Sequence, residues 1–121
     1  MATPLNVFKS VSVPITEGPI TGDSDVVYTT PNGITTIVLM AQVANVDSDQ
    51  QVHEVTLKQA SASAATPIHL VRGYRVQPRD GVSLTTGKLI VEENGVIRCS
   101  TLAGSANKLE LTLSFLESLN G

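Results

Sequence analysis

The stretch TTPNGITTIVLMAQVANVDSD, residues 29–49, indicates the fold class. It opens on a Pro-Asn-Gly turn signal and closes on Asp-Ser-Asp, another turn signal. Between these signals, only Gln42 and Asn45 interrupt the apolar run 37–46. That run is about half as long as a membrane helix requires, and its ends resemble those of a strand. We therefore predict a strand over 34–46, apolar on both of its faces.

The rest of the chain repeats this arrangement. Runs rich in Val, Ile and Thr alternate with short turn signals, as in β-sandwiches. The predicted strands cover 5–13, 25–30, 34–46, 51–60, 67–77, 88–93, 96–102 and 108–118. The 121 residues suit one domain. We predict an all-β, single-domain antiparallel β-sandwich of about eight strands over 1–121, with 1–13 as an extended N-terminal arm or strand.

Alternation and turn residues predict local details. In the segment KLELTLSFLES a period of two sends four side chains to the core: Leu109, Leu111, Leu113 and Phe115. The pair Asn94-Gly95 predicts the tip of a hairpin, with positive φ at both residues. Pro78 predicts a type I turn in which it is the second residue.

Composition excludes several classes of protein. The net charge is −3, which argues against a nucleic-acid partner. Charged residues are 16%, below the roughly 25% usual for soluble domains, so part of the surface is expected to meet a partner. Aromatic residues are 3% with no Trp, which disfavours sugar-binding modules and single-strand platforms.

The single cysteine, Cys99, allows no disulfide within the chain. The sequence therefore falls outside the disulfide-stapled secreted class and fits synthesis in a reducing cytoplasm. The N-terminal MATPLNVFKS lacks a charged and apolar signal-peptide pattern. We expect no signal peptide, no transmembrane segment and no membrane partner.

No residue pattern points to catalysis or to a cofactor. His53 and His69 each lack a nearby third metal ligand, so we expect structural or surface roles for both. Cys99 fits a small packed apolar residue better than a nucleophile. The chain has neither a Gly-rich phosphate loop nor a nucleophile elbow. We predict a protein that is not an enzyme and has no catalytic, cofactor-binding or metal-binding residue.

Two Asp-Ser-Asp triplets, 23–25 and 47–49, leave a calcium site open as an alternative. The rest of a calcium-loop pattern is missing. Asp and Ser side chains that bond to their own backbone in turns explain the triplets more simply, and we favour that explanation.

The second face of the strand 34–46 predicts an interface. Strict alternation assigns one set to the core: Ile37, Leu39, Ala41 and Val43. It assigns the other set to the second face: Ile34, Thr36, Val38, Met40, Gln42 and Ala44. A two-layer sandwich buries one face of a strand, so a loop at 14–25 or 60–66, or another subunit, must cover the second. The low charge favours a subunit and hence a homo-oligomer.

Two more residues are candidates for contacts. Arg72 and Tyr74 lie two apart in a predicted strand, which places them on one face, with Arg75 on the opposite face. Arg and Tyr are enriched at protein interfaces. The complete candidate interface set is Val38, Met40, Gln42, Arg72 and Tyr74.

Four segments carry a resemblance to a known group of proteins. They are MATPLNVFKSVSVPI (1–15), VVYTTPNGITTIVLMAQVANV (26–46), LTTGKLIVEENGVIRCS (84–100) and NKLELTLSFLES (107–118). They resemble small virion structural proteins of tailed bacteriophages, especially phages of cyanobacteria. The resemblance covers most of the chain, its motifs are structural, and it marks no functional residues.

The resemblance implies a non-enzymatic part of a phage particle, synthesised in the host cytoplasm and located in the virion. We expect either a capsid decoration or cement protein or a neck or tail component, with other capsid or tail subunits as partners. Its action would be adhesion between subunits through the strand 34–46, the arm 1–13 and the loop 60–66. The alternative is a receptor- or glycan-binding module of a phage fibre or baseplate.

Overall fold

The computed structural model describes residues 6–17, 25–60, 67–85, 87–102 and 104–120. They form ten strands and no helix, and thus no helix that could cross a membrane. The strands are β1 (Asn6–Pro14), β2 (Thr16–Glu17), β3 (Val26–Thr29), β4 (Ile34–Asn45), β5 (His53–Ala60), β6 (Ile68–Val76), β7 (Gly81–Ser83), β8 (Leu89–Val91), β9 (Val96–Thr101) and β10 (Leu109–Leu119). The predicted all-β fold is confirmed, with β2 and β7 as short additional strands.

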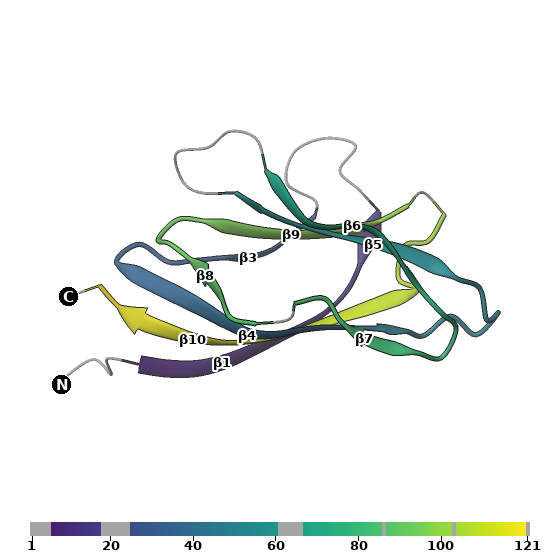
Figure 1. The fold of residues 1–121 in the computed structure, drawn as a ribbon, viewed down its shortest axis with the longest axis horizontal. Coiled ribbons are helices and arrows are strands. Elements are labelled where there is room, and N and C mark those ends of the chain that lie inside the picture. Colours follow the sequence, from purple (N-terminus) through teal and green to yellow (C-terminus); the bar gives the residue numbers. More distant parts are fainter. Residues whose placement is uncertain (1–5, 18–24, 61–66, 86, 103, 121) are drawn as a thin grey trace.

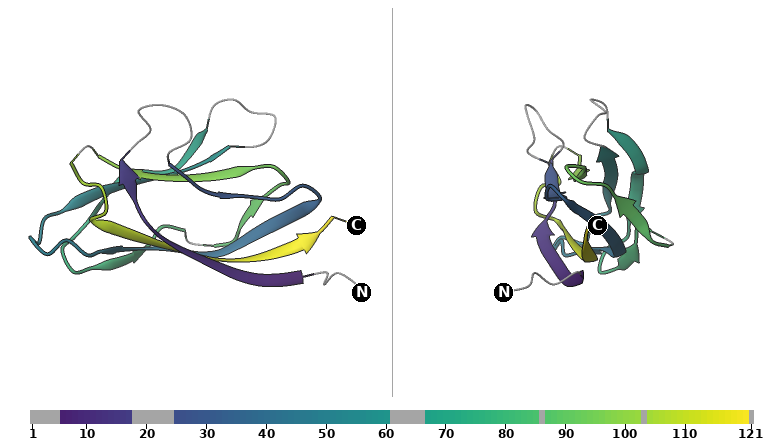
Figure 2. Two further views of the ribbon diagram at one scale, coloured as in Figure 1. Left: turned by 180° about the vertical axis from the view of Figure 1, so that it is seen from behind. Right: turned by 90° about the vertical axis from the view of Figure 1, so that its left-hand side faces the viewer.

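The strands build two sheets that pack face to face, which makes the molecule a β-sandwich (Figure 1). Sheet A has the order β1-β10-β4-β7, and β8 also pairs with β4. Sheet B has the order β2-β9-β5-β6, and β3 also pairs with β9. The strand pairs are antiparallel except β2 with β9, which is parallel. The views in Figure 2 show the chain crossing from β1 in one sheet to β2 in the other.

The core lies between the sheets and follows the predicted alternation of β10. Leu109, Leu111, Leu113 and Phe115 are each at most 1% exposed, which confirms their assignment to the core. From sheet B, Val55 and Leu57 of β5 and Ile97 and Cys99 of β9 face them. The ring of Tyr28 packs on Phe115 with the ring centroids 4.4 Å apart. Burial of these side chains is the main force holding the two sheets together.

A β-bulge in β4 changes which residues face the core. Ser114 pairs with Met40, but the next residue, Phe115, pairs with Val38, so Leu39 is the extra residue. The bulge reverses the alternation at that point. Val38 is 1% exposed and Leu39 is 41% exposed. The strict alternation predicted the opposite, and its assignment of Val38 and Thr36 to the second face, and of Ile37 and Leu39 to the core, is wrong.

The Asn94-Gly95 turn joins the two sheets and is not a hairpin tip. β8 pairs with β4 in sheet A, whereas β9 pairs with β3 and β5 in sheet B. Backbone bonds from Asn94 N to Thr30 O and from Thr30 N to Gly95 O hold the turn beside the residue that follows β3. Positive φ occurs at Asn94 (61°) and not at Gly95. The predicted hairpin is therefore wrong, although the predicted turn is present.

The turn at Pro78 also differs from its prediction. Asp80 N donates to Gln77 O, so Pro78 is the second residue, as predicted. Arg79, the third residue, has a φ of 60°, which belongs to a type II turn and not to type I. The turn carries the chain from β6 in sheet B to β7 in sheet A.

The described part of the N-terminal segment is a strand. β1 pairs with β10 along its whole length and forms an edge of sheet A. Residues 1–5 of the predicted arm, and most of the loops 14–25 and 60–66 that were candidates to cover β4, lie outside the described residues.

Candidate interaction surface

A row of apolar side chains crosses the outer face of sheet A. Phe8 of β1 pairs with Leu116 of β10, Leu116 with Ile37 of β4, and Ile37 with Ile90 of β8. Residues paired in this way project on the same side of a sheet. Phe8 is 75% exposed and Ile90 is 59% exposed, while Leu116 and Ile37 are half-buried. The four side chains, named the apolar row below, therefore present a continuous apolar strip to solvent.

The bulge in β4 extends the apolar row. It turns Leu39 outward beside Met40, which is half-buried and pairs with Ser114 on the outer face. A shallow depression lies between β1, β10 and β4, lined in part by Phe8, Ser10 and Leu39. The bulge thus adds a branched apolar side chain next to the row, which strict alternation would have buried.

Beyond the apolar row, this outer face carries mostly small or uncharged polar side chains and very little charge. The next outward positions along the strands are Ser10, Ser114 and Met40, followed by Ser12, Thr112, Gln42 and Ser83. Ser12 and Thr112 bond to each other across the strands at 3.1 Å. Among the paired outward residues of sheet A, Glu110 is the only charged one. An apolar strip flanked by small hydroxyl side chains suits a protein contact better than a charged ligand.

The structure separates the predicted interface residues of β4. Val38 lies in the core and has no surface to offer a neighbour. Met40 and Gln42 do face outward, and Gln42 is exposed. Their role in an interface remains a prediction. Phe8, Leu116 and Ile90, which complete the surface, were not predicted because their alignment depends on pairing between strands distant in sequence.

Arg72 and Tyr74 lie on β6, the edge strand of sheet B, and both are exposed. The pairing of β6 with β5 is irregular: Val71 pairs with Leu57 and Tyr74 pairs with Val55, which leaves two residues opposite Thr56. Gly73 sits there with a φ of 64°. Tyr74 therefore shares the side of Val71 and not that of Arg72, so the predicted common face of Arg72 and Tyr74 is wrong.

The same irregularity brings the two arginines of β6 to one side. Arg75 pairs with Glu54, and Arg72 lies opposite Thr56; both of these β5 residues face away from the core. The predicted opposite faces for Arg72 and Arg75 are therefore also wrong. The interface role predicted for Arg72 and Tyr74 remains a prediction.

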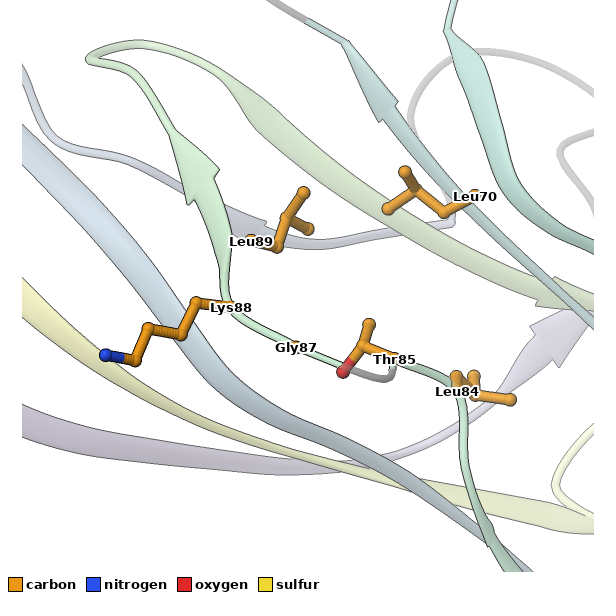
Figure 3. A pocket seen from close by; sticks show the side chains of 6 residues that line it. All are labelled: Leu70, Leu84, Thr85, Gly87, Lys88 and Leu89. Atoms are coloured by element: carbon orange, nitrogen blue, oxygen red, sulfur yellow. The ribbon is translucent and has the colours of Figure 1, made fainter.

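A shallow cleft lies beside β6, between the two sheets. Figure 3 shows Leu70 of β6 on one side, and Leu84, which follows β7, and Leu89 of β8 on the other. Thr85, Gly87 and Lys88 complete the lining. The cleft brings together neither two carboxylates nor a nucleophile with a base, so its residues suggest no reaction.

A polar cluster at one end of the sandwich links three segments of the chain. Nε2 of His53 lies 2.6 Å from Oδ2 of Asp47, and Nδ1 lies 2.8 Å from Oγ of Ser105. Because an ionised carboxylate only accepts hydrogen bonds, Nε2 carries the proton. Asn45 adds a bond from its amide to Val76 O at the end of β6. The cluster thus ties residues 46–52 and Ser105, which lies between β9 and β10, to the sheets, in agreement with a structural role for His53.

This cluster has the residue types of a catalytic triad, but the ring nitrogens are exchanged: Nδ1 of His53 faces the serine and Nε2 faces the carboxylate. The pKa of Asp47 is held below its usual range, mainly by the hydrogen bond from His53 and also by the Asp49 backbone N–H. Lys108 lies 3.7 Å from its other oxygen. Asp47 is thus satisfied by donors of the chain itself, as the turn explanation of the second Asp-Ser-Asp triplet predicted. Among the described residues, no three His, Cys, Asp or Glu side chains form a group that could hold a metal ion.

A second polar cluster closes the other end of sheet A. The hydroxyl of Tyr28 donates to Glu117, and Lys9 Nζ lies 2.9 Å from the other oxygen of that carboxylate. Burial raises the pKa of Glu117, but the bonds from Lys9 and Tyr28 and the charge of Lys9 outweigh it, so the net pKa is lowered. Burial and the bond to Glu117 raise the pKa of Tyr28 to about 12. The cluster holds β1 and β3 to β10.

The first triplet contributes a buried charge on sheet B. Asp25 is 1% exposed and lies 2.8 Å from Arg98 and 3.5 Å from Lys58. Its two neighbours are cations, so this carboxylate is matched by protein charges; Asp23 and Ser24 lie outside the described residues. Burial, and secondarily the charge of Asp25, raises the pKa of Cys99 to about 12. Such a thiol is not a nucleophile at neutral pH, in agreement with its predicted role as a packed residue.

Comparison with known proteins agrees with the fold. No protein-family model and no curated protein sequence matches the chain. A solved structure titled "Acidic stable capsid structure of Helicobacter pylori bacteriophage KHP30" is similar at a TM-score of 0.50 and 10% identity, over 99% of this chain and 92% of that one. The globular domain of zebrafish complement 1qA protein is similar at a TM-score of 0.39 and 11% identity, over 88% of this chain and 94% of that one. At these identities the likeness concerns the fold alone.

Proposed function

We propose that the chain is a non-enzymatic structural component of a bacteriophage virion that contacts neighbouring virion proteins through the outer face of sheet A. The observation that carries the proposal is the apolar row, Phe8-Leu116-Ile37-Ile90, exposed on a face with one charged residue among its paired positions. Exposed apolar strips of this kind mark contact surfaces.

The fold adds independent support. A chain with a similar fold occurs in a phage capsid structure, and the alignment spans nearly the whole of both chains. The sequence segments that resemble tailed-phage virion proteins form β1, β3, β4, β8 and nearly all of β9 and β10. A position on the capsid as a decoration or cement protein fits a small chain that binds by surface contacts repeated through symmetry. A neck or tail position would use the same surface.

Within this proposal Met40 and Gln42 belong to the same contact face, while Arg72 and Tyr74, on opposite sides of the edge strand β6, make separate contacts. Val38 is not part of the proposed contact face, because its side chain is enclosed in the core. The proposal includes no nucleic-acid or membrane partner, no cofactor and no metal. The binding energy comes from apolar burial and strand-edge pairing between subunits.

The test is the location of the chain in particles of the phage that encodes it. We expect peptides of the chain in gradient-purified virions, and immunogold labels on the capsid surface. Labels at the neck or tail would keep the virion role and reject the decoration role. Absence of the chain from purified particles, together with its presence in the infected-cell lysate, would reject the proposal. Specific binding to host glycans with labels at a fibre tip would support the receptor-binding alternative.

A further inference from the structure

We propose that the outer face of sheet A binds a second copy of this chain, with the apolar row of one copy packed against the apolar row of the other. The inference rests on the proposed function only in naming the partner of the same surface. If the face binds a second copy, the isolated chain associates in solution; if it binds only an unlike virion protein, the isolated chain stays monomeric.

The apolar row is suited to this partner because it spans the sheet without a break. Its four residues come from four adjacent strands, β1, β10, β4 and β8, and pair directly with one another. A two-fold axis in the plane of the contact, along the strands or along the row, brings this strip onto the same strip of a second copy. Side chains of two such sheets interdigitate at a separation of about 10 Å.

The charges of the face favour a second copy over an unlike charged partner. In a two-fold contact residue i of one copy meets residue j of the other, so charges of one sign on the face would repel unless opposite charges faced them, and a nearly uncharged face avoids that repulsion. Glu110 is the only charged residue among the paired outward positions, and it lies six residues along β10 from Leu116, roughly 20 Å away. The chain has eight Lys or Arg and eleven Asp or Glu residues, and all of those that the structure describes, except Glu110, lie away from these paired positions.

The area of the face is sufficient for a dimer. Four strands spaced about 4.8 Å apart and the eight paired residues of β1 before Pro14, at roughly 3.4 Å each, give about 520 Å² per copy and about 1,040 Å² for two, which just exceeds the roughly 1,000 Å² expected of a biological interface. The apolar row and Leu39 would form the centre of that contact, and the Ser and Thr positions would form its polar rim.

The test is sedimentation equilibrium of the intact chain and of two matched variants. Ile90 of the apolar row is 59% exposed, and Ile68 at the start of β6 in the other sheet is 65% exposed. Ile90→Asp and Ile68→Asp therefore make the same chemical change at equally exposed strand positions. We expect the unmodified chain to show twice the 12.7 kDa chain mass. Ile90→Asp should weaken association by roughly 30-fold or more, as at an interface hot spot, while Ile68→Asp should leave it unchanged.

A second variant guards against misfolding. Phe8→Asp changes the most exposed residue of the row, on a different strand, and should weaken association in the same way with an unchanged circular-dichroism spectrum. A monomer for the unmodified chain at about 100 µM, or dissociation by Ile68→Asp but not by the row variants, would overturn the inference. A monomeric chain that is still found in purified virions would leave the virion role intact and assign the face to an unlike protein. A dimeric chain absent from virions would reject the virion role alone.

Discussion

The bulge at Leu39 makes the sharpest single prediction, because it exchanges the environments of two adjacent residues. Val38 is 1% exposed and Leu39 is 41% exposed. Val38→Asp loses roughly 2 kcal/mol of apolar burial and places an unpaired carboxylate in the core, so we expect a loss of at least about 4 kcal/mol in the free energy of unfolding. Leu39→Asp loses part of a half-exposed side chain and some strand propensity, about 1 kcal/mol.

The assay is urea unfolding followed by far-ultraviolet circular dichroism, at a protein concentration low enough for all variants to be monomeric, because Leu39 also lies in the proposed contact between copies. If Val38→Asp fails to fold, Val38→Thr replaces it. That variant keeps the shape of Val38 and buries an unpaired hydroxyl, for an expected loss of about 1–3 kcal/mol. A larger loss for Leu39→Asp than for Val38→Asp would show that β4 alternates without a bulge and would refute the assignment of the outer face.

Three further predictions concern the turn after β8 and the two polar clusters. Gly95→Ala sets a Cβ 2.8 Å from Cγ1 of Val91 and should cost about 1–3 kcal/mol of unfolding free energy in urea, whereas Gly87→Ala has open space and should change it by less than about 0.5 kcal/mol. Because the pKa of Tyr28 is raised from 10.0 to about 12, its contribution to stability is present below pH 10 and is lost as the pH rises toward 12. Ultraviolet titration should show one tyrosine ionising near pH 12, and Tyr28→Phe should remove that step. Because the pKa of Asp47 is lowered, its contribution to stability is present above the unfolded-state pKa of about 4 and is lost as the pH falls through the folded-state pKa. The urea midpoint of Asp47→Asn should therefore depend less on pH in this range than that of the unmodified chain. An unchanged pH dependence would contradict the stabilising role of the Asp47–His53 cluster.

The sequence was most informative where local pattern and final environment agree. In β10 every second residue from Leu109 to Phe115 is apolar, and the bulge opposite Ser114 and Phe115 adds its extra residue to β4 and not to β10. Alternation along β10 alone therefore identifies its core residues. The turn signals located eight strands and missed only the short β2 and β7. These features depend only on residues that are close in the sequence, so the local sequence pattern is enough to predict them.

The failures all depend on contacts between distant segments. β4 is apolar on both sides, so its pattern contains no information on where a bulge falls; the pairing with Ser114 and Phe115 decides it. The pair Asn94-Gly95 fits a hairpin turn and a turn between two sheets equally well. The backbone hydrogen bonds to Thr30, a residue distant in sequence, favour the turn between sheets. The apolar row requires the registers of four strands at once, so Phe8 and Ile90 appeared unrelated in the sequence.

The central claim is that a second copy covers the outer face of sheet A, and cysteine labelling tests it most directly. The native Cys99 is 1% exposed with a pKa of about 12, so it provides a silent background. Ile90→Cys and Ile68→Cys each add one exposed thiol, on the two different sheets. We predict that maleimide labels Ile68→Cys rapidly at every protein concentration, but labels Ile90→Cys progressively more slowly as the concentration rises. Equal labelling rates for the two variants at all concentrations would contradict the claim.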